Sequence, residues 1–168
     1  ALNEQRIHDH PNKQRLEKAA SGRYIAPLFG QVVGREVCMN LPAEYAFDPD
    51  DIQSHAGMVA NLRDYPDAHI AQAARAVIER SADLTAVVLA AIIKGQNADN
   101  FDERAVTTGI LIEGTLFWKT DGYKERVEQQ LRQLIPAHIT PQFLHNDLAV
   151  QTNFIGVGYA TLAMGNRV

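Results

Sequence analysis

Residues 105–127 read AVTTGILIEGTLFWKTDGYKERV, and this stretch decides the fold class. Residues 105–112 are rich in β-branched and aliphatic side chains, which predicts a strand. Residues 116–119 (LFWK) follow the Glu-Gly-Thr turn, and they predict a second short strand. A sheet that contains residues 105–112 would separate an α/β fold from an unrelated, entirely helical interaction domain.

Helices and a further strand surround this stretch. Residues 121–135 place apolar side chains on one face and predict an amphipathic helix. Residues 138–145 predict another strand. Residues 68–95 lack proline and internal glycine and predict one long, mostly buried helix, with Gly95 as its C-cap. The chain is therefore predicted to be one α/β domain, rich in helix.

The N-terminal part is also predicted to be helical. Residues 13–37 carry apolar side chains at helical spacing, and Pro27 is expected to kink or restart that helix because it lacks a backbone donor. A loop follows. Asp50 or Asp51 is predicted to cap a short helix over 52–62.

Composition limits the class of protein. The 168 residues suit one domain over 1–168, with 1–9 expected to be flexible. The net charge of −4 disfavours nucleic acid as a partner. The apolar run 84–93 is too short to span a bilayer, so no membrane partner is expected. Cys38 stands alone, which excludes an intrachain disulfide and favours a cytoplasmic location.

Residues 10–24 (HPNKQRLEKAASGRY) contain the first candidate site. A carboxylate such as that of Glu17 can accept two hydroxyl hydrogen bonds from a sugar, although an exposed helical glutamate needs no function. Gly22 lies in a helical pattern, where glycine costs about 1 kcal/mol relative to alanine. Close approach of a nucleotide and close packing of helices are both reasons for such a glycine.

Two later segments contain further candidates. Gly114 and Thr115 follow a predicted strand and could offer backbone amides and a hydroxyl to a phosphate, although Glu-Gly-Thr is also a common hairpin turn. Gly156 and Gly158 precede a small-residue helix, where glycine often serves only packing. No metal site is predicted, because the His8–His10 pair lacks convergent ligands.

These segments resemble, in collinear order over about residues 10–165, the motifs of ATP-dependent sugar kinases of the hexokinase family. The family versions are NPGKQ-x-x-EK-x-x-SG-x-Y, a hydrophobic strand followed by VDGS-x-Y, and GSG-x-GAAL. The resemblance implies that Glu17 contacts the sugar. It assigns nucleotide contacts to Gly22, Arg23, Gly114, Thr115, Gly156 and Gly158.

The same resemblance implies the fold and the reaction. The fold would be the C-terminal part of the large domain of an actin-like (ribonuclease H-like) ATPase. The reaction would be phosphoryl transfer from ATP with Mg²⁺ to the terminal hydroxyl of a hexose such as glucose. The family's DLGGTN-type phosphate loop and its catalytic aspartate are absent, so no catalytic residue is assigned.

Two interpretations stay open. The missing N-terminal half of the same protein would supply the base, and this chain alone is then expected to be inactive. Alternatively, the chain is a non-catalytic regulatory or interaction module derived from a hexokinase-like fold. Departures from the family pattern near Pro27 and at Tyr159 keep that alternative open.

Overall fold

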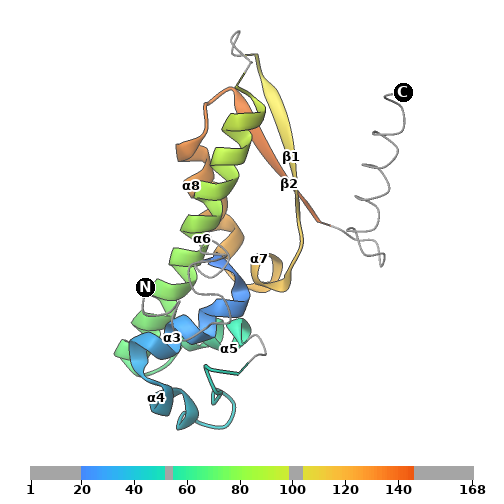
Figure 1. Ribbon diagram of the computed structural model, residues 1–168. Helices are drawn as coiled ribbons and strands as arrows, with labels where there is room; N and C mark the ends of the chain where they lie inside the picture. Colours follow the sequence, from blue (N-terminus) through green and yellow to red (C-terminus); the bar gives the residue numbers. More distant parts are fainter. Residues whose placement is uncertain (1–19, 52–54, 99–103, 146–168) are drawn as a thin grey trace, which may run out of the picture.

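The computed structural model describes residues 20–51, 55–98 and 104–145, and it contains a pair of parallel strands that lie to one side of the helices (Figure 1). Strand β1 spans Val106–Ile112 and β2 spans Ile139–His145. Val106 lies opposite Ile139 at one end of the ladder, and Ile112 lies opposite His145 at the other. The strand predicted over 105–112 is therefore confirmed, and it lies in a sheet.

The long helix α6 (Ala68–Gln96) runs along the length of the molecule (Figure 1). Its N-cap is Asp67, whose carboxylate accepts hydrogen bonds from the backbone N–H groups of His69 and Ile70 at 2.9 and 3.2 Å. The prediction of one long helix is confirmed. Its predicted end is wrong, because the helix continues through Gly95 and the C-cap is Asn97.

The burial predicted for α6 is only partly correct. Val87 and Ile92 are each 51% exposed, so the second half has an apolar outer side. Small side chains dominate the buried side and let neighbouring elements approach the helix axis closely. The buried residues of α6 are Ile70, Ala71, Ala73, Ala74, Val77, Ile78, Ser81, Ala82, Ala86, Ala90 and Ile93.

Helix α8 (Tyr123–Leu134) packs against α6 and confirms the predicted amphipathic helix. Its Val127 and Leu131 are fully buried. Arg126 joins the two helices, because its guanidinium donates to both carboxylate oxygens of Asp83, at 2.7 and 2.9 Å. A second ion pair joins Arg126 to Glu79 at 3.0 Å. These contacts hold α8 beside the middle of α6.

Residues 116–119 do not form the predicted second strand. They lie in a short helix, α7 (Thr115–Lys119), which follows a backbone turn at Gly114. Strand β1 pairs in parallel with β2, and not in a hairpin with residues 116–119. The helical turn also buries Phe117 and lets the Trp118 indole N–H donate to the Ile112 carbonyl at 2.9 Å.

The predicted helix over 13–37 is divided into shorter segments, within the part described. One break falls at Gly34, where φ is 98°. Another lies where η1 passes into α3, two residues before Pro27, and this fits the predicted restart of the helix. Pro27 lies in the first turn of α3, where no backbone donor is needed. Ser21 caps the first segment by accepting from the N–H of Arg23 at 3.3 Å. The segments are η1 (Gly22–Tyr24), α3 (Ile25–Val33) and α4 (Arg35–Met39).

The next helix is shorter than predicted. Helix α5 spans Ala56–Asn61 and passes into the 3-10 turn η2 (Leu62–Asp64). Neither Asp50 nor Asp51 caps it, because the N-cap position is His55. Asp51 instead lies 3.5 Å from the His55 ring nitrogen, as an ion pair when the imidazole is protonated.

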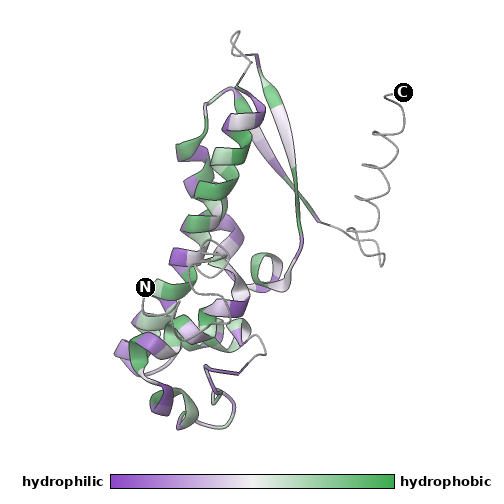
Figure 2. Ribbon diagram, in the orientation of Figure 1, coloured by the Kyte–Doolittle hydropathy of each residue, from purple (hydrophilic) through white to green (hydrophobic). Residues whose placement is uncertain are grey.

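The hydrophobic core lies where α3, α5, α6 and α8 meet, and it continues to the inner face of the sheet. Figure 2 shows apolar residues along the helices, whereas β2 and the interior of β1 include less hydrophobic positions. The outward sheet face carries Leu111 and Leu144, which are 52% and 43% exposed. In the part of the chain described, no helix combines the length and the apolar character that crossing a bilayer requires.

A close contact anchors α3 to the loop before α5. A β-carbon added at Gly30 would lie 2.6 and 2.7 Å from the Cβ and Cγ of Pro49, so this glycine is required by packing. Cys38 is fully buried beside the same contact. Desolvation in this environment raises the pKa of the Cys38 thiol to about 11.

Gly30→Ala should therefore lower the free energy of unfolding by about 1–3 kcal/mol through overpacking, less the gain in helix propensity. Gly95→Ala is the matched control, because nothing lies within 4 Å of its added β-carbon. We expect that control to be neutral or stabilising. Urea unfolding of both variants makes the measurement, and equal stabilities would contradict the packing account.

The Cys38 thiol should make stability depend on pH. Because its folded pKa exceeds the unfolded value of about 8.5, the contribution is complete below pH 8.5 and is lost as the pH rises toward 11. The difference in unfolding free energy between the wild type and Cys38→Ala should thus shrink over this range. A difference that stays constant from pH 8 to pH 11 would show that burial does not shift this thiol.

Candidate functional site

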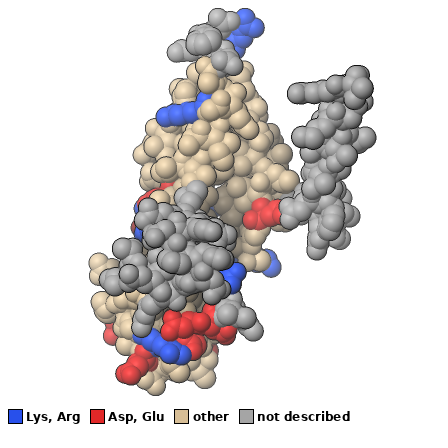
Figure 3. Space-filling view, in the orientation of Figure 1, with Lys and Arg blue, Asp and Glu red and all other residues tan. Residues whose placement is uncertain are grey.

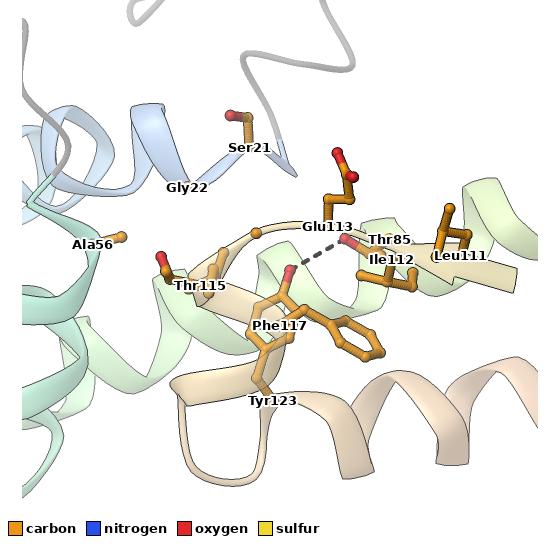
Figure 4. Close-up of a pocket in the computed structure, with 12 residues that line it drawn as sticks. Ser21, Gly22, Ala56, Thr85, Leu111, Ile112, Glu113, Thr115, Phe117 and Tyr123 are labelled. Carbon is orange, nitrogen blue, oxygen red and sulfur yellow. Dashed lines mark hydrogen bonds between the residues drawn. The ribbon is translucent and has the colours of Figure 1, made fainter. Parts of the chain in front are cut away.

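A cavity of about 540 Å³ opens at the carboxyl end of β1 (Figure 4). The end of β1 and the following turn form one wall, and Ser21 and Gly22 form another. Side chains from α6 and α8 line its inner side. The lining residues are Ser21, Gly22, Ala56, Thr85, Leu111, Ile112, Glu113, Gly114, Thr115, Leu116, Phe117 and Tyr123.

The turn after β1 depends on a glycine. Gly114 has φ 114° and ψ 145°, a backbone conformation that side chains with a β-carbon rarely adopt. The space around it is open, so conformation and not crowding demands glycine at this position. Thr115 follows directly and begins α7. The predicted pair of Gly114 and Thr115 therefore lies on the cavity wall, at the end of a strand and not in a hairpin.

Gly22 lies across the cavity from this turn. A β-carbon added at Gly22 would meet Leu116 at 3.5 Å and Ala56 at 3.8 Å, which are ordinary van der Waals distances. Packing within the described chain therefore does not require glycine here. Of the two reasons that the sequence left open, close helix packing loses its support.

The structure does not bring every predicted residue into this cavity. Arg23 is exposed and is not part of the lining. Its guanidinium carbon lies 6.0 Å from the ring centroid of Tyr24, which is a cation–π arrangement. Glu17, Gly156 and Gly158 lie outside the described residues.

Three hydroxyl groups that were not predicted from the sequence lie at the inner side of the cavity. Thr85 and Tyr123 line the cavity, and Ser81 contacts Tyr123 without being part of the lining. Ser81, only 1% exposed, donates to the carbonyl of Ala20. The Tyr123 hydroxyl lies 2.9 Å from the Ser81 hydroxyl and 3.1 Å from that of Thr85. Figure 4 shows the contact between Thr85 and Tyr123. The available signal was the spacing of Ser81 and Thr85, which lie four residues apart and therefore on one side of the predicted helix.

This cluster also positions the cavity wall. Ala20 immediately precedes Ser21 and Gly22, so the bond from Ser81 fastens that wall to α6. Tyr123 connects the same point to α8. The hydroxyl cluster, defined as Ser81, Thr85 and Tyr123, thus joins three separate segments at one place.

A second hollow of about 310 Å³ adjoins the first and shares Ala56, Thr115 and Leu116 with it. Its polar lining includes Arg63 and Lys119. Arg63 already donates to the backbone carbonyls of Ala60 and Asp121, at 2.8 and 2.6 Å. That side chain therefore serves mainly to tie η2 to the turn before α8.

Few charged side chains line the larger cavity. Glu113 is the one acidic residue among those that line the larger cavity. No group of three or more histidine, cysteine, aspartate or glutamate side chains suited to a metal ion occurs in the described ranges. On the face in Figure 3, Lys and Arg residues of the described part are scattered and form no continuous basic surface.

The comparison with protein families identifies the class. A family model described as hexokinase matches residues 48–164, which is more than half of the chain, and the chain therefore belongs to the hexokinase family. No curated protein matches the sequence. Gly114, Thr115, Gly156 and Gly158 lie inside the matched range. Residues 10–24, with Glu17, Gly22 and Arg23, precede it.

Gly114→Ala should lower the free energy of unfolding by about 1–3 kcal/mol, because alanine would be strained at this positive φ. Gly57→Ala is the control, since Gly57 lies in α5 with nothing within 4 Å of an added β-carbon. Thermal or urea unfolding measures both. If the two alanines have equal effects, the turn relaxes without cost and Gly114 is not conformationally required.

Proposed function

We propose that this chain is the C-terminal part of an ATP-dependent hexose kinase that phosphorylates the terminal hydroxyl of a hexose such as glucose. Membership of the hexokinase family supports the kinase class. In this proposal the described helices and parallel strands form part of an actin-like ATPase domain in a cytoplasmic enzyme. An N-terminal half of the same protein supplies the first phosphate loop and the catalytic base.

The observation that carries the proposal is the position of the larger cavity. In parallel α/β sheets, ligands bind beyond the carboxyl ends of the strands, and this cavity lies at the carboxyl end of β1. Its volume of about 540 Å³ falls in the range of small-molecule sites. Gly22 and Gly114 border it from opposite sides, and neither presents a side chain to an entering ligand.

The polar groups of the turn suit a phosphate. The Thr115 hydroxyl and the backbone N–H groups beside Gly114 are donors that a phosphate oxygen can accept. Glu113 stands next to them on the lining, and its carboxylate would repel a bare triphosphate. Magnesium, which commonly binds through one or two carboxylates and the substrate phosphates, would accompany ATP and offset that repulsion.

The remaining contacts follow from the family resemblance. Glu17 would accept hydrogen bonds from sugar hydroxyls, and Gly156 with Gly158 would border the adenosine. Arg23, one residue beyond the cavity wall, would approach the nucleotide from outside. Each of these assignments is a proposal for the protein with its N-terminal half in place.

Thr115→Ala should weaken binding of Mg-ATP by about tenfold or more, because a hydrogen bond to a charged phosphate contributes about 1.5–3 kcal/mol. Titration with a fluorescent ATP analogue in the presence of Mg²⁺ measures the affinity. Thr107→Ala is the matched control, since Thr107 is an exposed threonine on β1 outside the cavity. Equal affinities of the two variants would remove Thr115 from the nucleotide site.

A coupled assay for glucose phosphorylation tests whether the catalytic base lies in the N-terminal half and not in this chain. The 168-residue chain alone should show no turnover, and addition of an N-terminal half with an intact phosphate loop should restore it. Turnover by the chain alone would overturn the assignment of the base to another segment. Saturable binding of a sugar or nucleotide without restored turnover would favour the non-catalytic module.

A further inference from the structure

The hydroxyl cluster has fewer protons than contacts. Ser81, Thr85 and Tyr123 carry one hydroxyl proton each, yet the structure places them in four hydrogen-bonding contacts. Ser81 gives its proton to the Ala20 carbonyl. Thr85 gives its proton to the backbone carbonyl of Ser81 at 2.9 Å. Only the Tyr123 proton is left for the two remaining contacts.

Because the cluster has too few protons for its contacts, a hydroxyl oxygen on the cavity side can accept a further hydrogen bond. Tyr123 can donate to Ser81 or to Thr85, but not fully to both. Ser81 is buried at 1% exposure, whereas Thr85 is half-buried and lines the cavity. Because a hydroxyl oxygen has two lone pairs, Thr85 Oγ1 retains acceptor capacity even when Tyr123 donates to it. A donor entering the cavity can therefore reach an acceptor at Thr85, which lies beside Tyr123 in the lining.

We propose that Thr85 is a specificity-determining residue, and that its Oγ1 accepts a hydrogen bond from an N–H or O–H donor of the bound nucleoside. This inference rests on the proposed nucleotide site. The donor is the exocyclic amine of adenine or a ribose hydroxyl, since both are neutral donors of similar reach. Tyr123 also lines the cavity, and we assign it the role of a positioning residue because its hydroxyl contacts both Ser81 and Thr85.

The chemistry of the two side chains separates their roles. Thr85→Val keeps the β-branched shape but removes the acceptor. Tyr123→Phe keeps the ring in the core and removes the proton that competes for Thr85, so the acceptor at Thr85 remains. A merely structural cluster would respond alike to both changes, whereas an acceptor at Thr85 responds only to the first.

Comparison of nucleotide analogues on the 168-residue chain combined with an N-terminal half that has an intact phosphate loop provides the test. Affinities would be measured by calorimetry for Mg²⁺ complexes of ATP, inosine triphosphate, 2′-deoxy-ATP and 3′-deoxy-ATP. Inosine triphosphate has a carbonyl in place of the amine, and each deoxy analogue lacks one hydroxyl. We expect the wild type to bind one of these analogues about tenfold more weakly than ATP, which identifies the donor.

The variants then assign that preference. In Thr85→Val, ATP should bind only as tightly as the disfavoured analogue, and Thr85→Ser should restore the preference. Tyr123→Phe should keep the ratio of ATP to analogue affinity even if both affinities fall. Thermal unfolding of each variant reports whether the fold persists.

Two results would overturn the inference while leaving the nucleotide site in place. One is equal binding of ATP and all three analogues by the wild type, a result that needs no variant. The other is an equal loss of affinity for every nucleotide in Thr85→Val. Absence of nucleotide binding by the wild type would instead overturn the proposed function, and the inference with it.

Discussion

The parallel pairing of β1 with β2 is the constraint on which the rest of the structure depends. Parallel strands cannot be joined by a tight hairpin, so the chain must cross over between them. It does so through α7 and α8, and α8 packs against α6. The chain therefore turns sharply after Ile112, at a glycine with positive φ, and the larger cavity forms at this turn.

Helix α6 contributes to the inner side of the cavity that lies at this crossover. Its buried side consists largely of alanines, which allow α3 and α8 to lie close to its backbone. Ser81 and Thr85 interrupt this apolar side where three segments meet. Buried hydroxyl groups need partners, and these two find them in Ala20, Tyr123 and the backbone of α6 itself. The same requirement fixes the position of the wall that contains Gly22.

The family and the geometry supply different kinds of information about function. The match over residues 48–164 establishes the hexokinase family and includes the turn at Gly114 and Thr115. The geometry adds that Gly22, which precedes the matched range, borders the same cavity. Gly22 and Gly114, which are distant in the sequence, therefore border the same cavity. Arg23, although adjacent to Gly22, lies outside that space, because its side chain extends over the ring of Tyr24.

The sequence by itself determined the elements whose signals are local. Three elements follow from residue type, side-chain spacing and the absence of proline. They are the β-rich run 105–112, the long helix that begins at Ala68 and the amphipathic helix with Val127 and Leu131. Gly114 was also recognisable as a turn residue after the predicted strand, beside a threonine whose hydroxyl could bind a phosphate.

Only the tertiary structure decided the features that depend on distant partners. Residues 116–119 have strand-forming side chains, but the position beside β1 is taken by β2, so they form a helical turn that buries Phe117. The hydroxyl cluster joins residues about forty positions apart, and nothing local to Tyr123 indicates a partner at Ser81. Hydrogen bonds and packing between such residues are set by how the elements meet, and therefore the inner side of the site could not be predicted from spacing alone.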